Sequence, residues 1–588
     1  MAALRAELRV RGLSGFLIPS TDEFQSEMAP PCDERLLWLT GFSGSWGLAI
    51  VLDDAAALFV DGRYTLQAAK QVDAALFEVV KYPDVKPADW LRAKAAQGAT
   101  VGYDARLHSV TEVKVYRKAA EAAGAAFTPV DANPVDAIWT DRPAQPASII
   151  ASHPLRVAGV TAADKLAALR ETLCADKQHA VALASPQSIA WALNIRAGDL
   201  AHTPVALGYA LIYEPGGADI FISPERLSPE AAAELDGVAR FRPAHELSDA
   251  LAALAGKIVR LDPERASAWL DDRLRTAGAV VSAAPDPCLG PRARKNPVEI
   301  AGARAAHERD GAALVRFLHW LDTQPAGAID EIGAAQRLEA LRRDAGARDI
   351  SFATIAGAGP NGAVVHYRPT RSTNRALEAG TLFLIDSGGQ YEDGTTDVTR
   401  TVAVGAPTPD MRRQFTLVLK GHIALAEARF PAGTKGVELD SFARAALWRA
   451  GLDYDHGTGH GVGSYLSVHE GPASIGKRGS AVIEPGMILS NEPGYYRTGQ
   501  YGIRIENLML ALPPEHVPGG DRPMMAFETL TLAPIDASLI DATLLTEAET
   551  RWINAYHERV FEALASHLPA DVAAWLRAAT QPLPGAQA

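Results

Sequence analysis

Short apolar runs bounded by glycine, proline and acidic residues alternate with amphipathic stretches through the first 300 residues. The runs GFLIPS (15–20) and WGLAIVLDDAAALFVDGRY (46–64) predict strands, and the second of them predicts a hairpin with an acidic turn. The Ala-rich stretch TLQAAKQVDAAL (65–76) predicts a helix. Strands alternating with helices indicate an α/β unit, and a Pro- and Asp-rich segment at 131–148 predicts its end near residue 150.

The next 150 residues show the same order of features. A predicted helix at 163–178 precedes a Trp-containing segment, a break, and two strands within YALIYEPGGADIFISPERL (209–227). The segment 36–64 likewise has a Trp-containing entry, a Gly-rich break and two strands joined by an acidic turn. Two explanations stay open, a distant tandem duplication with a period of about 150 residues and a chance similarity between α/β units.

A third region opens at Pro297, which precedes an amphipathic stretch and predicts the start of a long helix. Apolar residues recur there at helical spacing, at Ala306, Ala313, Leu314, Phe317, Leu318 and Leu321. Helices alternate with strongly apolar strands to about residue 535, and a helical segment follows at 546–568. The sequence therefore predicts an α/β protein with three domains, 1–150, 151–297 and 298–588, the last ending in a helical extension at about 535–588.

Composition and charge narrow the classes of function. Hydrophobic residues make up 48% of the chain and charged residues 22%, which is typical of a globular protein. The 57 Lys and Arg and 70 Asp and Glu give a net charge of −13, and this acidic balance argues against a nucleic-acid partner. The chain has no apolar run long enough to span a membrane and no signal-peptide core near its N-terminus, so we expect no membrane segment and a cytoplasmic location.

The three cysteines, Cys32, Cys174 and Cys288, are too few and too widely separated for a disulfide framework or a thiolate zinc site. They are expected to be free thiols in a reducing compartment, which agrees with the expected cytoplasmic location.

Candidate chemistry begins at Asp386, which ends the apolar strand TLFLID. A carboxylate at the end of such a run costs free energy unless a partner compensates it, and either a metal ion or a hydrogen-bonded turn is a possible partner. Asp397 follows after the turn-rich stretch SGGQYEDGTT. A strand, a turn and a second strand would bring the two carboxylates onto one face of a sheet.

Three histidines, His456, His460 and His469, lie within fourteen residues, although the whole chain has only fifteen. The spacing of His456 and His460 fits one face of a helix, but glycines at 457, 459, 461 and 463 argue against a helix there. A loop or strand is predicted instead, with a backbone that a ligand can approach closely.

Glu492 and Glu506 each follow or lie within another apolar strand, in MILSNEPGYY and YGIRIENLMLAL. Arg504 is two residues from Glu506, so on a strand both side chains would share a face, and Arg504 could orient a carboxylate. Taken singly, each carboxylate could simply belong to a salt bridge on a strand.

Taken together, the four carboxylates carry four negative charges, which two divalent cations would balance. One imidazole among oxygen ligands suits Mn²⁺, Co²⁺ or Zn²⁺. Two such ions a few ångströms apart can share a hydroxide and polarise a carbonyl, which is hydrolase chemistry.

These residues resemble the pita-bread metallopeptidases and, among them, the three-domain aminopeptidase P (Xaa-Pro aminopeptidase) family. The resemblance rests on motifs spread over nearly the whole chain: LTGFSGSWG, FVDGRY, SFATIAGAGPNGAVVHYRP, LIDSGGQYEDGTTDVTRT, HGTGHGVG, HEGP, NEPGYY, GIRIEN and LTEAETRWINAYH. It implies two creatinase-like N-terminal α/β domains followed by a pseudo-two-fold pita-bread domain, whose curved antiparallel sheet holds the site. The one departure is Trp46 in GFSGSWG, where a small residue is usual; it bears on local packing or a dimer contact.

The resemblance also implies roles for individual residues. It assigns the metal ligands to Asp386, Asp397, His460, Glu492 and Glu506, with Asp397 and Glu506 bridging two divalent ions, which we expect to be Mn²⁺, with Co²⁺ and Zn²⁺ as alternatives. It assigns proton transfer to Glu492 as well. His366, in VVHYRP, matches a substrate-contacting histidine, and His456 and His469 match residues that line the proline side and stabilise the tetrahedral intermediate.

The activity implied is hydrolysis of the N-terminal Xaa-Pro bond of peptides with proline at position 2, by a hydroxide between the two ions. The alternatives are a prolidase acting on Xaa-Pro dipeptides, a metal-free creatinase-like enzyme, and a peptidase-like binding module without activity. A homodimer through the catalytic domain is also implied, with each N-terminal region reaching the partner's active site. An apolar face on the C-terminal helix could either form that interface or pack on its own domain; its residues are Trp552, Ala555, Tyr556, Val560 and Phe561.

Overall fold

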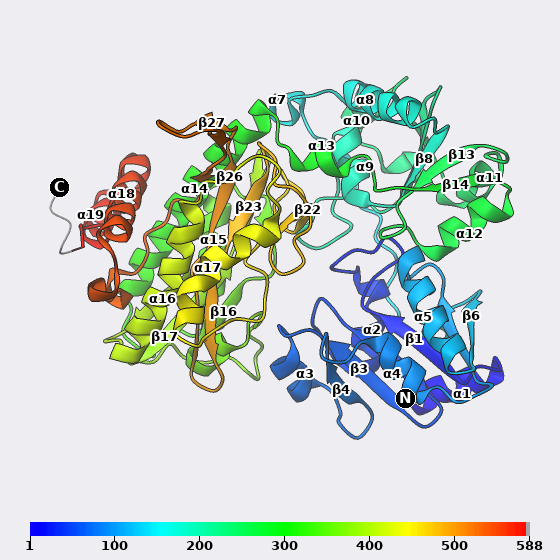
Figure 1. The fold of residues 1–588 in the computed structure, drawn as a ribbon, viewed down its shortest axis with the longest axis horizontal. Helices are drawn as coiled ribbons and strands as arrows, with labels where there is room; N and C mark the ends of the chain where they lie inside the picture. The colour runs from blue at the N-terminus through cyan, green and yellow to red at the C-terminus, as the bar shows by residue number, and fades with distance from the viewer. Residues whose placement is uncertain (584–588) are drawn as a thin grey trace. The chain divides into compact units, whose positions relative to one another are not determined.

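The computed structural model describes residues 1–583, which form two compact units (Figure 1). The first unit comprises Met1–Leu155 and Val160–Leu289, and the second comprises Arg156–Gly159 and the chain from Gly290 onward. This division does not separate the first 297 residues, so the boundary near residue 150 stays a prediction. Within the described chain, we find no helix that combines the length and apolarity needed to cross a membrane.

The first unit contains two six-stranded sheets of identical topology. Their strand orders are β4-β3-β2-β1-β5-β6 and β12-β11-β10-β8-β13-β14, and corresponding neighbours run in the same relative direction in all five pairs. This agreement favours the predicted tandem duplication over chance similarity. The strands are β1 Gly15–Pro19, β2 Leu48–Leu52, β3 Ala56–Val60, β4 Glu78–Lys81, β5 Thr100–Asp104, β6 Ala126–Val130, β8 Ala180–Leu183, β10 Tyr209–Tyr213, β11 Ala218–Phe221, β12 Arg240–Arg242, β13 Ile258–Leu261 and β14 Val280–Ala283.

The helices of this unit begin where the sequence supplies a cap. Ser109 caps one helix and Ser267 caps its counterpart in the second sheet, and the two serines also face each other in an antiparallel bridge. The helix predicted over 65–76 is shorter, because the chain becomes extended at Val72. The helices are α1 Ala2–Val10, α2 Arg35–Thr40, α3 Thr65–Gln71, α4 Pro87–Lys94, α5 Val110–Ala122, α6 Pro134–Ile138, α8 Ala162–Ala175, α9 Pro186–Leu193, α10 Pro229–Leu235, α11 Leu247–Ala252 and α12 Ala268–Thr276.

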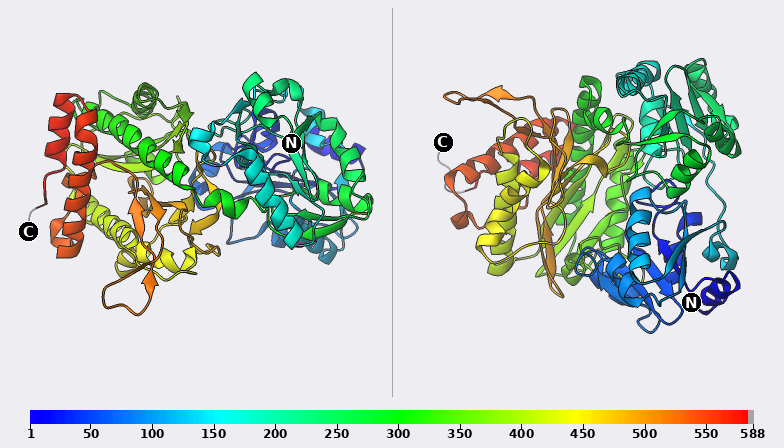
Figure 2. Two further views of the ribbon diagram at one scale, coloured as in Figure 1. Left: turned by 90° about the horizontal axis from the view of Figure 1, so that it is seen from above. Right: turned by 45° about the vertical axis from the view of Figure 1, so that its right-hand side comes forward.

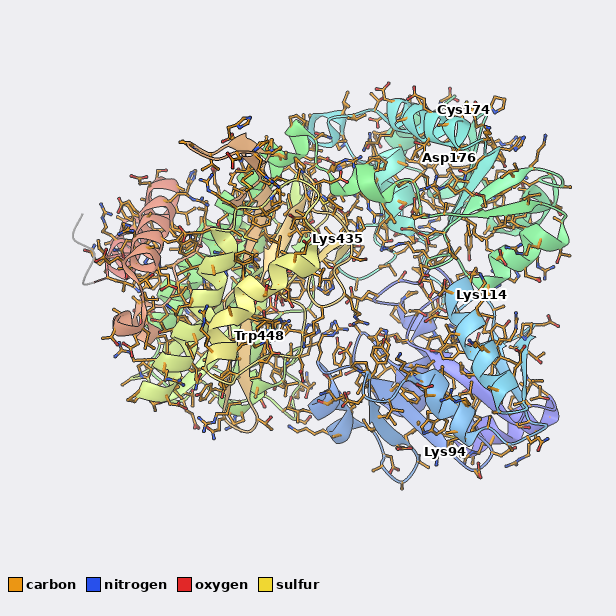
Figure 3. All side chains as sticks on the ribbon, in the orientation of Figure 1. Lys94, Lys114, Cys174, Asp176, Lys435 and Trp448 are labelled. Carbon is orange, nitrogen blue, oxygen red and sulfur yellow. The ribbon has the colours of Figure 1, made fainter. Side chains whose placement is uncertain are left out.

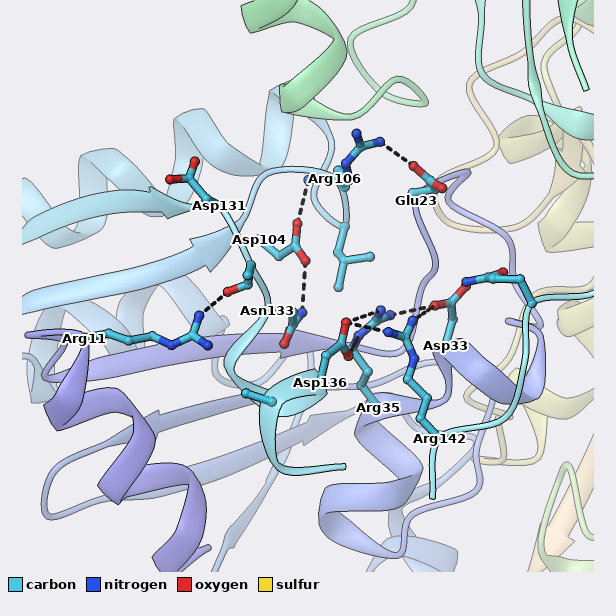
Figure 4. Close-up of a pocket in the computed structure, with 14 residues that line it drawn as sticks. Arg11, Glu23, Asp33, Arg35, Asp104, Arg106, Asp131, Asn133, Asp136 and Arg142 are labelled. Atoms are coloured by element: carbon cyan, nitrogen blue, oxygen red, sulfur yellow. Dashed lines mark hydrogen bonds and ion pairs between the residues drawn. The ribbon is translucent and has the colours of Figure 1, made fainter. Parts of the chain in front are cut away.

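Two further features of this unit concern charge and packing. A recess of about 480 Å³ at the carboxyl ends of β5 and β6 is lined by arginines that pair with neighbouring acids, as Arg35 and Arg142 do with Asp136 (Figure 4). Trp46, the residue that departs from the family pattern, contacts the ring of Tyr82 with centroids 5.2 Å apart. Its bulk is therefore accommodated inside its own domain.

The second unit begins with α13 (Leu289–Ala293) and the long helix α14 (Pro297–Asp322). Asn296 and Glu299 form a capping box at the start of α14, as the proline signal predicted. Two antiparallel sheets, β16-β17-β20 and β22-β21-β23-β26-β29, carry the candidate site. Their strands are β16 Ile355–Ala358, β17 Thr381–Ser387, β20 Val398–Val404, β21 Gly459–Gly461, β22 Glu470–Ile475, β23 Ile488–Asn491, β26 Asn507–Ala511 and β29 Phe527–Thr529.

The other elements of this unit cover or join these sheets. The helices α16 and α17 pack side by side, and a two-stranded ribbon of β24 and β25 precedes β26. The elements are α7 Leu155–Ala158, α15 Glu331–Asp344, α16 Pro409–Ala426, α17 Gly436–Arg449, β15 Asp349–Ile350, β18 Gly389–Tyr391, β19 Gly394–Thr395, β24 Gly494–Arg497, β25 Tyr501–Arg504, β27 Glu515–His516 and β28 Pro523–Met524.

The C-terminal extension folds as α18 (Glu547–Leu564) and α19 (Ala570–Ala579), which pack against α14 (Figure 2). Tyr556 and Val560 are buried, Trp552 and Phe561 are partly buried in the same core cluster, and Ala555 is exposed. The apolar face of this helix therefore packs on its own domain and is not free to form the expected dimer contact.

Burial of His557 on α18 leads to a prediction about acid stability. Its Nε2 accepts a hydrogen bond from the backbone N–H of Ile535 at 3.1 Å, which requires a neutral ring, and burial and the charge of Arg400 lower its pKa to about 4. The unfolded chain binds the proton near pH 6.5, so acid below that pH favours unfolding, by about 2 kcal/mol at pH 5.

We therefore expect the melting temperature of His557→Gln to fall less between pH 7.5 and pH 5 than that of the wild type. Glutamine can keep the acceptor without titrating. Differential scanning fluorimetry at both pH values measures the effect, and an equal fall in the two proteins would contradict it.

Candidate functional site

The hairpin of β17 and β20 brings the first two candidate carboxylates to one place. Asp386 lies near the end of β17, opposite Thr399, and Asp397 directly precedes β20. Their exposed fractions are 7% and 4%, so both carboxylates are buried. The predicted arrangement of strand, turn and strand is confirmed, with the short strands β18 and β19 inside the turn.

Glycines allow the second sheet to bring His460 and Glu492 together. His460 lies in β21, and Glu492 directly follows β23. A Cβ atom on Gly459 would lie 2.1 Å from the carbonyl oxygen of Ser490, so only glycine permits this approach of the two strands. His460 Nε2 lies 3.5 Å from Oε1 of Glu492 and 3.4 Å from Oδ2 of Asp397.

Arg504 and Glu506 do not share one strand as the sequence predicted. Arg504 ends β25, which pairs with β24, and Glu506 lies in the break before β26, which pairs with β23 and β29. The chain changes partners there, and Thr399 joins the two side chains. Arg504 Nε donates to Thr399 Oγ1 at 3.1 Å, and that hydroxyl donates to Glu506 Oε2 at 2.7 Å.

Burial and nearby negative charge raise the pKa of Asp386, Glu492 and Glu506. Burial raises the pKa of Asp386 to about 7, where Arg504 opposes the rise and Asp397 and Glu492 add to it. Burial, with the charge of Asp397, also raises the pKa of Glu492 and raises that of Glu506 well above its usual range. For His460 burial lowers the pKa, but its hydrogen bond with Asp397 and the charge of Glu492 outweigh this and raise it to about 9.

The cluster holds less positive than negative charge. Arg504 Nη2 contacts Oδ2 of Asp386 at 2.5 Å, but the four carboxylates would carry four negative charges when ionised, and Arg504 with a protonated His460 would balance only two of them. Two carboxylate oxygens of the cluster, Asp386 Oδ1 and Asp397 Oδ1, are buried and accept no hydrogen bond from any residue that the structure describes. Ligand atoms of Asp397, His460 and Glu506 lie within 4.8 Å of one another. Unpartnered carboxylate oxygens beside an imidazole fit divalent cations.

His456 is held by a chain of hydrogen bonds that begins at Arg504. Arg504 Nη1 donates to the hydroxyl of Tyr496 at 2.6 Å, and that hydroxyl lies 2.8 Å from Nε2 of His456. Because arginine can only donate, the tyrosine oxygen accepts from Arg504 and the tyrosine O–H donates to Nε2 of His456. The ring of His456 is then neutral, and its Nδ1 donates to the carbonyl of Gly457 at 2.7 Å. The rings of Tyr454 and Tyr496 lie 4.8 and 5.4 Å from the ring of His456.

The other two histidines lie near the same cluster. The ring of His469 meets that of His460 edge-on, with centroids 4.3 Å apart, and its side chain is exposed. His366 is half-buried and directly follows Val365, whose carbonyl accepts a hydrogen bond from Arg504 at 3.3 Å. All three candidate histidines therefore lie beside groups that contact the carboxylate cluster.

Sequence reasoning missed the hydroxyl groups that connect these residues. Thr399 joins Arg504 to Glu506, Tyr496 joins Arg504 to His456, and Ser490 Oγ donates to Oε1 of Glu492 at 3.1 Å. The period of two on a strand offered a signal, since Thr399 follows Asp397 by two positions and Ser490 precedes Glu492 by two. Tyr496 had no comparable signal.

Comparison with known families agrees with this geometry. The model of metallopeptidase family M24 matches residues 301–512, and the model of the C-terminal region of peptidase M24 matches residues 523–583. Two models of the creatinase/prolidase N-terminal domain match residues 1–138 and 141–299.

Similar proteins match the whole chain. The "Probable Xaa-Pro aminopeptidase P" proteins of Aspergillus fumigatus and Aspergillus niger are each 39% identical over 99% of this chain, and cover 92% and 98% of their own lengths. The crystal structure of X-prolyl aminopeptidase from Caenorhabditis elegans, described as a cytosolic enzyme with a dinuclear active site, matches 99% of both chains at 35% identity with a TM-score of 0.94.

The prolidase of Pyrococcus horikoshii shares the fold, at 23% identity and a TM-score of 0.50, over 63% of this chain and 99% of its own. The similarity to the aminopeptidases extends over nearly the full length of the chain. Together with the matches to the family models, it decides the family to which the chain belongs. The chain belongs to the Xaa-Pro aminopeptidase P family of M24 metallopeptidases, with two creatinase-type N-terminal domains ahead of a pita-bread catalytic domain.

Proposed function

We propose that the protein is a metal-dependent aminopeptidase that removes the N-terminal residue from peptides with proline at position 2. The observation that carries the proposal is the convergence of four buried carboxylates and His460, with two carboxylate oxygens left unpartnered among the described residues. Family membership over the full length of the chain supports the substrate class. Proline lacks an amide N–H and has a fixed φ angle, so general peptidases handle Xaa-Pro bonds poorly.

The residues that would hold the metal ions are Asp386, Asp397, His460, Glu492 and Glu506. Two divalent ions would supply positive charge toward the peptide carbonyl and lower the pKa of a nearby water. We propose Mn²⁺ as the native ion, with Co²⁺ and Zn²⁺ as alternatives, because carboxylate oxygens far outnumber the one nitrogen in the set and oxygen-rich sites suit Mn²⁺.

The chain's own groups would move the proton and orient the substrate. Glu492 would accept the proton of the attacking water and pass it to the proline nitrogen as the C–N bond breaks. His366 and His469 would donate hydrogen bonds to the substrate and to the developing oxyanion.

His456 would line the proline side of the site. Both of its ring nitrogens contact protein groups, and the adjacent rings of Tyr454 and Tyr496 give that side an aromatic surface. An aromatic surface suits the apolar proline ring. In this arrangement Arg504, through Tyr496, would orient the imidazole.

A prolidase is the alternative activity. It would use the same ligands on Xaa-Pro dipeptides, and the prolidase structure leaves the chain partly unmatched. We therefore favour the aminopeptidase, and the length of the preferred substrate distinguishes the two.

We also propose a cytoplasmic enzyme that acts as a homodimer through its catalytic domain. The C. elegans protein is described as cytosolic. With the C-terminal helix packed on its own domain, the outer face of α17 is the better candidate interface. Val437, Phe442 and Trp448 on α17 are 41%, 42% and 47% exposed, and Figure 3 labels Trp448 on this helix. They are large apolar side chains that the structure leaves exposed on the catalytic unit, and such side chains contribute to interaction surfaces.

Activity tests the proposed function directly. Metal-stripped protein reloaded with Mn²⁺, Co²⁺ or Zn²⁺ should cleave Xaa-Pro-Yaa tripeptides faster than Xaa-Pro dipeptides. Asp397→Ala and Glu506→Ala should each lower kcat/KM by about a thousandfold or more, because each removes one of the residues that would hold the metal ions. Asp410→Asn is the control, since this carboxylate lies at the surface beside Arg497. Preference for dipeptides would indicate prolidase, and activity that survives chelation would exclude the metal mechanism.

Chelation should destabilise the protein more at high pH. Without metal, Asp386 (pKa about 7) and His460 (pKa about 9) hold protons in the folded state that the unfolded chain releases at lower pH. That contribution to stability is lost as the pH rises through these values, whereas bound cations replace the protons. The gap in melting temperature between loaded and chelated protein should widen by roughly 5 °C between pH 6 and pH 9. A constant or narrowing gap would contradict this.

Sedimentation tests the proposed dimer. The wild type should sediment at micromolar concentration with twice the mass of one chain, and the double variant Phe442→Ser/Trp448→Ser should sediment as a monomer. Val115→Ser on α5 is the matched control, because Val115 is 50% exposed but lies in the other unit. A monomeric wild type, or a double variant that stays dimeric, would exclude this interface.

A further inference from the structure

Three ionic side chains outside the carboxylate cluster are almost fully buried beside the loop that carries His469. The side chains of Arg292, Lys295 and Glu470 are 4%, 1% and 2% exposed. Lys295 Nζ donates to the carboxylate of Glu470 and, at 3.1 Å, to the carbonyl of Arg292. Arg292 Nε lies 3.1 Å from Oε2 of Glu470. We call these three residues the Glu470 clamp.

Burying the three ionic side chains of the clamp costs free energy. Moving ions out of water carries a desolvation penalty, and apolar side chains of similar volume often give equal or greater stability. Ionic groups differ from apolar ones in fixing both the distance and the direction of their partners. The residues beside the clamp indicate which parts of the site it holds in place.

The position of Glu470 determines where His469 and the strand that carries His460 lie. It is the first residue of β22, and His469 directly precedes it, so the two side chains leave the backbone on opposite sides. Gly461 pairs with Glu470, and a Cβ on Gly461 would lie 2.2 Å from the carbonyl oxygen of Glu470. With no side chain between these backbones, a shift of Glu470 would move the His469 ring relative to the His460 ring.

The segment that supplies the two cations also contacts the strand leading to Glu492. The backbone N–H of Lys295 donates to the carbonyl of Gly486 at 2.9 Å, and Arg294 forms an antiparallel bridge with Met487. Strand β23 begins at the next residue and ends just before Glu492. One short segment therefore contacts both the His469 side and the Glu492 side of the site.

We propose that Lys295 and Arg292 are positioning residues that act on the reaction through Glu470 and His469. They hold the Glu470 carboxylate so that His469 meets the substrate at a fixed place beside His460. The proposal rests on the proposed function, in which His469 contacts the substrate. Small misplacements of such a group can lower the rate by up to about a hundredfold.

A double-mutant cycle between Lys295 and His469 tests the proposal. Lys295→Met keeps the length of the side chain but removes its charge, and Glu470 keeps Arg292 as a partner. We expect this variant to lower kcat/KM for an Xaa-Pro-Yaa peptide by about ten- to a hundredfold, with its metal content unchanged. In a His469→Ala background the same change should alter kcat/KM by less than about twofold, since residues that act through one contact are not additive.

Arg294→Met is the matched control. Arg294 is the neighbour of Lys295 in sequence, but it pairs at the surface with Glu484, and the two side chains are 43% and 40% exposed. Its replacement should leave kcat/KM within twofold of the wild type. Lys295→Gln, which keeps a hydrogen-bond donor, serves in the same cycle if Lys295→Met does not yield folded protein by thermal melting.

The possible results separate the two proposals. If the Lys295 and His469 effects multiply, or if Lys295→Met keeps wild-type kcat/KM, the clamp does not act through His469 and the inference is overturned. If His469→Ala keeps wild-type activity, both the inference and the substrate role of His469 fail. Failure of the proposed function itself would show as a wild-type enzyme that does not cleave Xaa-Pro peptides.

Discussion

The catalytic unit is organised around the mutual repulsion of four carboxylates inside a protein interior. Burial and neighbouring charge raise the pKa of Asp386, Glu492 and Glu506. Water would screen such charges well, but an interior does so poorly, so the protein must supply compensating groups or leave places for cations. Arg504 supplies one positive charge, and His460 has a raised pKa for the same reason. The remaining imbalance is the charge that the proposed divalent ions would balance.

The C-terminal extension takes part in this arrangement through Arg400. This buried guanidinium donates to the carbonyls of Thr399 and Glu506, to those of Ala533 and Pro534, and to the hydroxyl of Tyr556 on α18. It therefore joins the backbone beside the carboxylates to the first helix of the extension. Packing of α18 on its own domain is explained by this role, because Tyr556 must lie inside the unit to reach Arg400.

The sequence predicted those parts of the structure that depend on local pattern. The hairpin that joins Asp386 to Asp397, the helix that starts at Pro297 and the doubled topology of the first unit all follow from apolar runs, turn residues and capping residues. The convergence of the four carboxylates could be predicted from their charges. The residues that contact those carboxylates could not be predicted in this way. The break before Glu506 depends on which strand each segment pairs with, and that choice is made by tertiary contacts. The Glu470 clamp joins residues 175 positions apart, beyond the reach of any periodicity.

The carboxylates and the histidines of the site lie on different kinds of backbone. The carboxylates lie in or beside paired strands, whereas the three candidate histidines lie on loops or at strand ends, where glycine gives the backbone freedom. Each histidine is held through a buried cation from another segment. Arg444 donates to the carbonyl of His456 at 2.8 Å, Arg504 donates to the carbonyl before His366, and the Glu470 clamp holds the residue after His469. These bonds go to the backbone or to a neighbouring residue, so each cation fixes the place of a histidine in the chain without contacting its imidazole. The fold thus fixes each histidine-bearing segment from a buried cation that belongs to another part of the chain.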